Sequence, residues 1–440
     1  MKVNALLLLV PIAFCACNST RRIEKTAKQT VLDEPALRNA HVGITIFDPA
    51  AGKYWYNYQG DHYFVPASNT KIATCYAAMK YLGDSLTGIF KAENDTALIL
   101  MPNGDPSLLH PDFQQQPVID LIRRSTKKVC VAPAPWQNDA LGPGWAWNDY
   151  NDDYMAERSA LPVYGNVLKW VQEKGSEGPL VYSIPEVTWA VDFDTVKARN
   201  FFVRRALNEN IYEITEGNEK LREQDVPFVT HGMRSALELL ADTVHKTVGL
   251  CPADLQSALV NYAPGVAPIH SQPTDSLLKP MMHRSDNFFA EQSLVMVSNA
   301  ILHEMNDEKV IDTLLKTDFK DLPQKPRWVD GSGLSRYNLF SPQDLVAILD
   351  KMKNDFGMDR IKNILATGNE GTLHNYYLAE HGYIFAKTGT LSGVVSISGF
   401  LYTKRNKLLI FSVLVNNHNG SPTEVRRSVE KFIETLRNNF

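Results

Sequence analysis

Ser68 and Lys71 stand three residues apart in the stretch PASNTKIAT, residues 66–74. A serine hydroxyl becomes a strong nucleophile when a neighbouring base removes its proton. Residues i and i+3 share one face of a helix, so Lys71 can reach the Ser68 hydroxyl, and burial or a second cation would lower its pKa toward that of a base. Three other pairs have the same spacing, so spacing alone identifies no site: Ser125/Lys128, Ser276/Lys279 and Ser428/Lys431.

Two later strings supply groups that such a nucleophile needs. In Ser285-Asp286-Asn287, the serine could relay a proton to a leaving amine, and the Asn287 amide could donate to and accept from a peptide backbone. In Lys387-Thr388-Gly389, the lysine is a second cation, and Gly389 lets a substrate backbone lie along a strand edge.

The residues around Lys387 also suit a substrate's terminal carboxylate. Lys387, Thr388 and Thr390 offer a cation and two hydroxyls, and a charge-assisted hydrogen bond contributes roughly 1.5–3 kcal/mol. The backbone N–H groups of Ser68 and Thr390 are natural oxyanion donors, and losing one such donor slows a reaction about 100- to 1000-fold. Together the strings predict a serine acyl-transfer site.

The three strings, in this order, resemble the low-molecular-mass class C penicillin-binding proteins, the D-alanyl-D-alanine carboxypeptidases/endopeptidases with a large insertion. The long interval between Ser68 and Ser285 also resembles this group. The segment HNYY (374–377) departs from it, because the family often has a basic residue there. Five further strings look like recurrent strings of the family: NGDPSL (103–108), GWAWNDY (144–150), DGSGLSRYN (330–338), GNEGTL (368–373) and AKTGTLSGV (386–394).

The resemblance implies a fold and a reaction. The fold class would be α/β: a β-lactamase/transpeptidase-like domain, with an antiparallel sheet flanked by helices, and a large, mostly β insertion. Ser68 would form an acyl-enzyme with peptidoglycan stem peptides, with Lys71 as general base and Ser285 as proton relay. β-Lactams would inhibit by acylating the same serine, and no cofactor is implied. Carboxypeptidase and endopeptidase activities share this chemistry, so the sequence does not separate them.

Two other functions stay open at this point. A serine β-lactamase needs fast deacylation, and we find no additional base comparable to the dedicated glutamate of class A enzymes. A catalytically silent cell-wall-binding protein could keep the fold. The presence of Ser68, Lys71, Ser285, Asn287 and Lys387 together argues against that alternative.

Hydrophobic periodicity predicts the elements of the domain that carries these residues. Residues 41–60 alternate around a Pro-Ala-Ala-Gly turn and predict a β-hairpin. Apolar residues at helical spacing predict a helix over about 68–82. Further helices are predicted at about 275–284, 288–305, 308–316, 342–354 and 422–437, and strands at 382–389, 394–403 and 407–417. We therefore expect one antiparallel sheet assembled from both ends of the chain.

Residues 86–270 are then predicted to be an insertion into a peptidase domain made of 41–85 and 271–440. The insertion contains short β-like runs (TALILM, KKVCVA, PLVYSI and EVTWAVDF) and a helix in MRSALELLADTVHKTVGL.

The N-terminus predicts export. Residues 1–17 combine Lys2, the apolar run ALLLLVPIAF and a cysteine, as in a bacterial lipoprotein signal, in which Cys17 would become the lipid anchor. Simple secretion with cleavage nearby is the alternative. Residues 18–40 would form a tether and a first helix. We therefore expect a periplasmic protein, membrane-anchored through that lipid.

Composition excludes several other classes. A chain of 440 residues suggests two or three domains. Its formal net charge of −4 and pI near 6.3 give no basic footprint for nucleic acid. The cysteines show no zinc-ligand spacing and there is no His-Glu-x-x-His string, so we expect no metal.

The remaining candidates have structural interpretations. Beyond the signal only Cys75, Cys130 and Cys251 remain, and this odd, widely spaced set predicts no disulfide framework. Cys75 is predicted to be a core residue. Asp105 and Asp286 are expected to accept backbone N–H bonds in loops. Trp145 and Trp147 could stack on a sugar or pack under a loop, and DGSGLSRYN could be a site loop or a Gly-rich turn.

Overall fold

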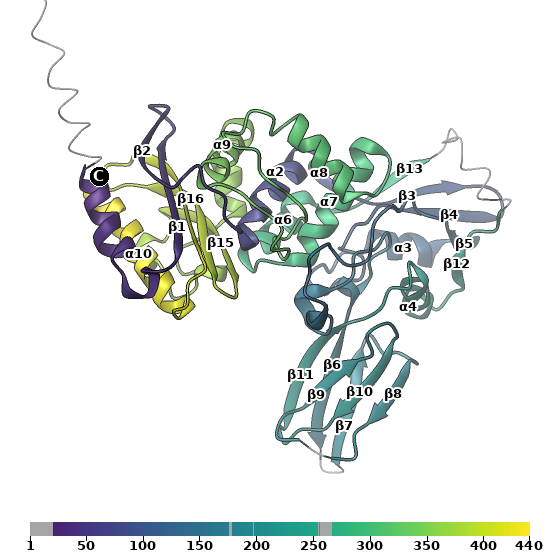
Figure 1. The fold of residues 1–440 in the computed structure, drawn as a ribbon. Helices are drawn as coiled ribbons and strands as arrows, with labels where there is room; N and C mark the ends of the chain where they lie inside the picture. The colour runs from purple at the N-terminus through teal and green to yellow at the C-terminus, as the bar shows by residue number, and fades with distance from the viewer. Residues whose placement is uncertain (1–20, 176–177, 197, 254, 256–265) are drawn as a thin grey trace, which may run out of the picture. The chain divides into compact units, whose positions relative to one another are not determined.

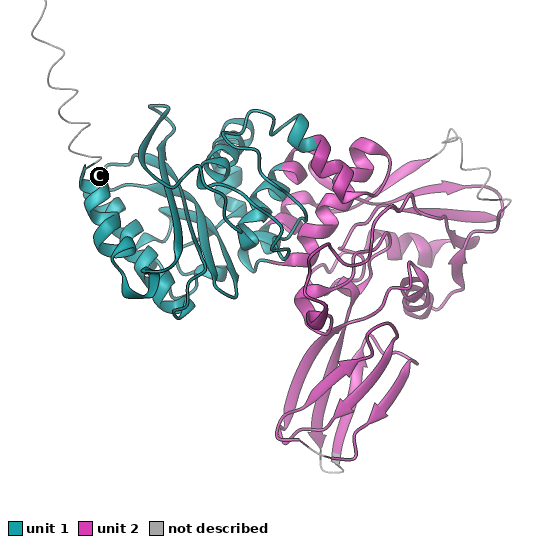
Figure 2. Ribbon diagram, viewed as in Figure 1, with its two compact units in different colours: residues 1–76, 279–285, 314–440 teal, residues 77–278, 286–313 magenta. Residues whose placement is uncertain are grey.

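The computed structural model describes residues 21–175, 178–196, 198–253, 255 and 266–440 (Figure 1). The predicted signal and Cys17 lie outside the described residues. Contacts divide the chain into two compact units (Figure 2). The first unit contains residues up to 76, 279–285 and 314–440, and the second contains 77–278 and 286–313. The predicted boundaries of the insertion, 86 and 270, stay a prediction.

The first unit is built on a six-stranded sheet in the order β14-β15-β16-β17-β1-β2. All its neighbouring strands are antiparallel. The strands are β1 (His41–Asp48), β2 (Lys53–Tyr58), β14 (Ala366–Thr367), β15 (Ile384–Leu391), β16 (Val394–Tyr402) and β17 (Leu408–Asn416). Strands from both ends of the chain therefore form one sheet, which confirms that prediction.

Helices cover this sheet within the first unit. The helical residues 21–32 and α10 (Pro422–Asn439) share a hydrophobic core with β1, β16 and β17 (Figure 1). Helix α9 (Pro342–Ile364) packs against β1 and β17 and changes direction at Gly357, whose φ is +75°. Strand β17 is buried at every position after its first, as expected for a strand covered on both faces.

The second unit contains a five-stranded mixed sheet and two three-stranded sheets. The first has the order β12-β5-β4-β3-β13, and the others are β11-β6-β7 and β8-β10-β9. Their bounds are β3 (Ser85–Glu93), β4 (Ala97–Pro102), β5 (Lys128–Val131), β6 (Val167–Gly175), β7 (Gly178–Ile184), β8 (Ala190–Phe193), β9 (Phe202–Arg205), β10 (Ile211–Thr215), β11 (Leu221–Pro227), β12 (Val248–Leu250) and β13 (Ala267–Pro273). The four predicted β-like runs overlap β4, β5, β7 and β8, which confirms the prediction of strands there.

Helices accompany these sheets. Helices α3 (Pro117–Arg124) and α4 (Arg234–Val244) contribute to the core under the sheets. The predicted later helices are α6 (Thr274–His283), α7 (Asn287–Leu302) and α8 (Asp307–Lys316). The α-helix α2 (Lys71–Tyr81) follows a 3-10 turn, η3 (Ala67–Thr70). The division between the units falls inside α2, α6 and α8.

The expectation of no disulfide was wrong. Cys130 and Cys251 are bonded, with their Cα atoms 4.8 Å apart although 121 residues separate them in sequence. Parallel pairing of β5 with β12 sets Cys130 opposite Gly249, two residues before Cys251. Such long-range pairing leaves no trace in cysteine spacing. Cys75 is buried, as predicted.

The described part of the chain shows no group of three or more His, Cys, Asp or Glu side chains placed to hold a metal ion. Among the described helices, none has both the length and the apolar character required to cross a bilayer.

Candidate active site

The Ser68 turn is the centre of the site. Ser68 lies in the 3-10 turn η3. This turn leads directly into α2, whose first residue is Lys71. The Lys71 Nζ atom donates to the Ser68 hydroxyl at 3.0 Å and to the Ser332 carbonyl at 2.7 Å. Lys71 has no exposed surface. The predicted serine–lysine contact is therefore present, and the lysine is held in a buried position.

A glycine-rich loop holds this turn in place. Gly333 has a φ of +83°, and a Cβ atom there would lie 1.9 Å from the Ala67 carbonyl oxygen, so only glycine fits. The Thr74 hydroxyl donates to the Gly331 carbonyl at 2.7 Å. Ala67 itself has a φ of +49°, a strained conformation that persists only when its surroundings enforce it. The loop is part of the site and not merely a turn.

Asp330 gives the loop its shape. Its carboxylate accepts from the backbone N–H groups of Gly333 at 2.8 Å and Ser335 at 2.6 Å, and from the Asn338 amide at 2.7 Å. The carbonyl of Ser332 is the contact that sequence reasoning missed. Backbone groups carry no sequence signal, so only the glycine-rich string itself could have indicated it.

Lys387 and Ser285 form the second serine–lysine contact. The Lys387 Nζ atom donates to the Ser285 hydroxyl at 2.8 Å and to the Thr388 carbonyl at 2.7 Å. Ser285 has a φ of +66°, which is again unusual for a residue with a side chain. Burial, and then repulsion from Lys71, hold the pKa of Lys387 well below its ordinary value. The two lysines of the motifs are therefore electrostatically coupled.

Strand β15 passes close to the nucleophile turn. A Cβ atom on Gly389 would lie 2.8 Å from the Ser68 backbone nitrogen and 2.9 Å from the Pro66 carbonyl. Glycine is thus required for this approach, which places the Ser68 N–H beside the strand. β14 pairs only with Phe385 and Ala386. Within the described residues, no strand pairs with 387–391 on that side, so this edge of β15 can accept an extended peptide.

The side chains of Thr388 and Thr390 lie on one face of β15, since successive residues of a strand alternate. The Thr388 hydroxyl is 2.6 Å from the Thr372 hydroxyl, and the Thr390 hydroxyl accepts from Arg426 at 2.8 Å. Sequence reasoning identified neither Thr372 nor Arg426. Thr372 belongs to the string GNEGTL, but nothing in the string distinguishes it.

Asn287 belongs to the second unit, although it is two residues from Ser285 in the chain. Asp286 caps α7 by accepting from the Phe289 backbone N–H at 2.9 Å, which confirms its structural role. This fixes Asn287 as the first helical residue, and its amide donates to the Tyr154 carbonyl at 3.0 Å. Asp105 likewise accepts from the Ser107 backbone N–H at 2.9 Å.

Two of the other Ser-x-x-Lys pairs have ordinary structural contacts. The Ser428 hydroxyl donates to the Thr30 carbonyl and ties α10 to the N-terminal helix. Ser125 follows the end of α3, and its hydroxyl accepts from the Lys127 backbone N–H at 3.2 Å. These serines are thus engaged with the backbone.

Trp145 and Trp147, both in the second unit, differ in how they are packed. Trp147 is 73% exposed, whereas the Arg158 guanidinium lies 5.5 Å from the centre of the Trp145 ring. Trp145 therefore packs inside its loop, and Trp147 does not.

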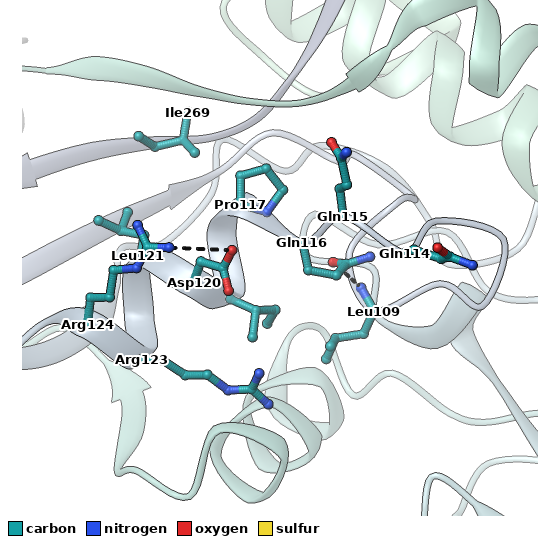
Figure 3. Close-up of a pocket in the computed structure, with 11 residues that line it drawn as sticks. Leu109, Gln114, Gln115, Gln116, Pro117, Asp120, Leu121, Arg123, Arg124 and Ile269 are labelled. Atoms are coloured by element: carbon teal, nitrogen blue, oxygen red, sulfur yellow. Dashed lines mark hydrogen bonds and ion pairs between the residues drawn. The ribbon is translucent and has the colours of Figure 1, made fainter.

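A cavity of about 750 Å³ in the second unit contains none of the motif residues (Figure 3). It is lined by Gln114–Gln116, the α3 residues around Arg123 and Arg124, and Ile269. The Gln116 side chain has a structural contact, because its amide oxygen accepts from the Leu109 backbone N–H at 2.9 Å. The candidate site is therefore defined by the contacts among the motif residues, and cavity size does not locate it.

Comparison with known proteins agrees with this geometry. Residues 24–436 match the D-Ala-D-Ala carboxypeptidase 3 (S13) family. The chain belongs to this family. It is thus an enzyme of a serine peptidase family, and the resemblance to the low-molecular-mass penicillin-binding proteins is confirmed.

Individual relatives cover nearly the whole chain. A D-alanyl-D-alanine carboxypeptidase of Actinomadura sp. is 28% identical over 91% of this chain and 82% of its own length. The crystal structure of penicillin binding protein 4 from Haemophilus influenzae has a TM-score of 0.70 at 20% identity, covering 95% of this chain and 98% of that one. The same protein in complex with a β-lactam has a TM-score of 0.67 at 18% identity, covering 95% and 98%. These likenesses confirm the predicted fold class.

Proposed function

We propose that this protein is a serine-type D-alanyl-D-alanine carboxypeptidase/endopeptidase that acts on peptidoglycan stem peptides through a Ser68 acyl-enzyme. One observation carries the proposal: two buried, coupled lysines each contact a serine hydroxyl, Lys71 with Ser68 and Lys387 with Ser285. This is an arrangement for moving protons at a nucleophile, and the family assignment agrees with it.

In the acylation step, the Ser68 oxygen attacks the carbonyl carbon of the penultimate D-alanine while its proton passes to the neutral amine of Lys71, which becomes an ammonium. The 3.0 Å separation of the Lys71 nitrogen and the Ser68 oxygen suits this transfer. The C–N bond then breaks, and the leaving amine takes a proton through Ser285. An ester on Ser68 remains. Water hydrolyses this ester, giving the free carboxylate and restoring the serine.

The tetrahedral intermediate needs donors for its oxyanion. The N–H groups of Ser68 and Thr390 are assigned this role, because β15 passes directly beside the Ser68 nitrogen at Gly389. Removing one donor of an oxyanion hole costs about 100- to 1000-fold in rate. The substrate backbone would extend along the open edge of β15. Asn287 is proposed to bind a peptide backbone through its side-chain amide.

The same strand is assigned the substrate's carboxylate. The hydroxyls of Thr388 and Thr390 and the Lys387 side chain are its proposed partners. β-Lactams present a strained amide beside a carboxylate, so they would acylate Ser68 as inhibitors. The β-lactam complex of the Haemophilus influenzae relative supports this proposal.

Export completes the proposal. We assign the protein to the periplasm, with residues 1–17 as a lipoprotein-type signal and a lipid on Cys17 as its membrane anchor. The Cys130–Cys251 disulfide supports export, because disulfides persist mainly in oxidising compartments. The catalytic domain is proposed to comprise 41–85 and 271–440, with 86–270 inserted.

Intact-protein mass spectrometry after incubation with benzylpenicillin tests the function, using the wild type and Ser68→Ala. We expect a persistent adduct on the peptide that contains Ser68 and none on the variant. Rapid loss of the adduct with accumulation of hydrolysed drug would indicate a β-lactamase. Absence of any adduct from folded wild-type protein would indicate a catalytically silent relative.

A further inference from the structure

Lys387 alone does not provide a strong ion pair for a substrate carboxylate. Its side chain has no exposed surface, and its nitrogen already donates to Ser285 and to the Thr388 carbonyl. Burial and the neighbouring Lys71 lower its pKa and so favour the neutral amine. A neutral amine offers a hydrogen bond but no ion pair. Strong recognition of a carboxylate needs a group that stays cationic, and guanidinium groups meet this need.

Arg426 is such a group, and it contacts the same strand. Its Nη2 atom donates to the Thr390 hydroxyl at 2.8 Å, joining α10 to β15 across 36 residues of sequence. Thr388 lies on the same face of β15, two residues earlier, with its hydroxyl 2.6 Å from that of Thr372. A cation and three hydroxyl groups therefore follow one face of the strand.

The packing of α10 holds Arg426 in this position. Val425 and Val429 are buried in the core that also contains Val395 of β16. Val395 is the cross-strand partner of Thr390, and such partners share one face of a sheet. Arg426 therefore extends from a rigid helix toward the end of β15, whereas Thr390 itself is exposed.

We propose that Arg426 is the specificity-determining cation that recognises the carboxylate beside the scissile bond. This rests on the acyl-transfer function proposed above. The ligand class is a peptide whose leaving residue carries a free α-carboxylate. Examples are a terminal D-alanine and a cross-linking residue whose D-configured carbon carries the carboxylate. A guanidinium can bind a carboxylate through two parallel N–H bonds.

The next residue of α10, Arg427, is engaged elsewhere. Tyr376 of the HNYY segment lies against it, with the Arg427 guanidinium 4.2 Å from the ring centre. Arg427 donates to the Glu430 carboxylate at 2.6 Å, so its charge is already paired. Arg427 is therefore a matched control: it is the neighbouring residue with the same charge, and its charge is engaged by Glu430 and Tyr376.

The test compares wild type, Arg426→Gln, Arg426→Lys and Arg427→Gln on an N-acylated L-Lys-D-Ala-D-Ala peptide and on its C-terminal amide. We expect Arg426→Gln to lower kcat/KM for the free acid about 10- to 150-fold, the range of a charge-assisted hydrogen bond. Turnover of the amide should change by less than about 2-fold if only the ion pair is lost. Arg426→Lys should restore part of the preference, and Arg427→Gln should leave both substrates unaffected.

A second measurement serves if the peptide amide is hydrolysed too slowly to be measured. It compares the rate of Ser68 acylation by benzylpenicillin with the rate of acylation by benzylpenicillin methyl ester. The acid preference of the wild type should fall as ionic strength rises, because salt screens an exposed charge. Equal losses on acid and neutral ligands, or an unchanged preference in Arg426→Gln, would overturn the assignment. Wild-type protein that benzylpenicillin never acylates would instead contradict the proposed function, so the two failures are distinguishable.

Discussion

Arg158 in the second unit and Lys387 in the first are both buried, but the groups that they contact differ. In the second unit, Arg158 is 2% exposed and is paired with the carboxylates of Asp307 and Glu291, the latter at 3.6 Å. It also donates to the carbonyls of Asp139 and Leu141. In the first unit, Lys387 is fully buried beside Lys71, and its own partners are a hydroxyl and a carbonyl.

The difference separates a structural charge from a reactive one. Carboxylates beside Arg158 compensate the desolvation of its charge, and its guanidinium holds a loop through two backbone carbonyls. Burial, and then repulsion from Lys71, make the charge of Lys387 unfavourable, which lowers its pKa and makes its proton transferable. A buried lysine that contacts a serine hydroxyl beside a second lysine therefore indicates the reactive part of the first unit.

The largest effect is expected from Lys71→Met, which keeps bulk and removes the amine. Ser68 acylation by benzylpenicillin should slow about 100- to 10,000-fold, the usual contribution of a general base. Rapid mixing followed by mass spectrometry measures this rate. A variant that acylates at the wild-type rate would show that Lys71 is not the base.

Arg158→Met should have its effect on stability instead. Leaving Asp307 and Glu291 buried without their cation should lower the free energy of unfolding by about 3–5 kcal/mol. Urea unfolding measures the change. The triple variant Arg158→Met/Glu291→Gln/Asp307→Asn is the control, because it removes the unpaired charges and should recover much of the loss. A loss below about 1 kcal/mol in the single variant would contradict the comparison.

The disulfide is the other stabilising device of the second unit. Replacing Cys130 and Cys251 together by alanine should lower the free energy of unfolding by about 2–5 kcal/mol. Cys75→Ala is the matched control, since it removes a buried thiol that forms no disulfide. Equal unfolding midpoints for the double variant and the wild type would show that the bond contributes nothing.

The smallest effect concerns pH. The pKa of Lys387 is lowered in the folded state. Between that value and the ordinary lysine pKa of about 10.4, the unfolded chain holds a proton that the folded chain has released. The free energy of unfolding should therefore rise with pH across this window. Below it, the contribution of Lys387 should stay constant and unfavourable.

Lys387→Met removes this titration. The free energy of unfolding of the variant, measured relative to that of the wild type, should therefore fall as pH rises. Urea unfolding at several pH values measures it. A difference that is independent of pH would mean that the pKa of Lys387 is not lowered.

Much of the fold was predictable because the signals are local. The hairpin of residues 41–60 and the C-terminal strands follow from alternating hydrophobicity, and α10 from its amphipathic repeat. The disulfide was not predictable, because the pairing of β5 with β12 joins segments far apart in the chain. The same holds for the contact of Arg426 with Thr390, which depends on how α10 packs on the sheet.

By itself the sequence determined the reactive groups: which serines and lysines are present, and in what order. Only the tertiary structure decided which of the four Ser-x-x-Lys pairs is buried beside a second lysine, and that Ser428 bonds to Thr30 instead. It also placed the Ser332 carbonyl on Lys71 and the glycine of β15 beside Ser68. The physical reason is that a side chain's identity is local, whereas its burial, pKa and partners are set by segments that folding brings together.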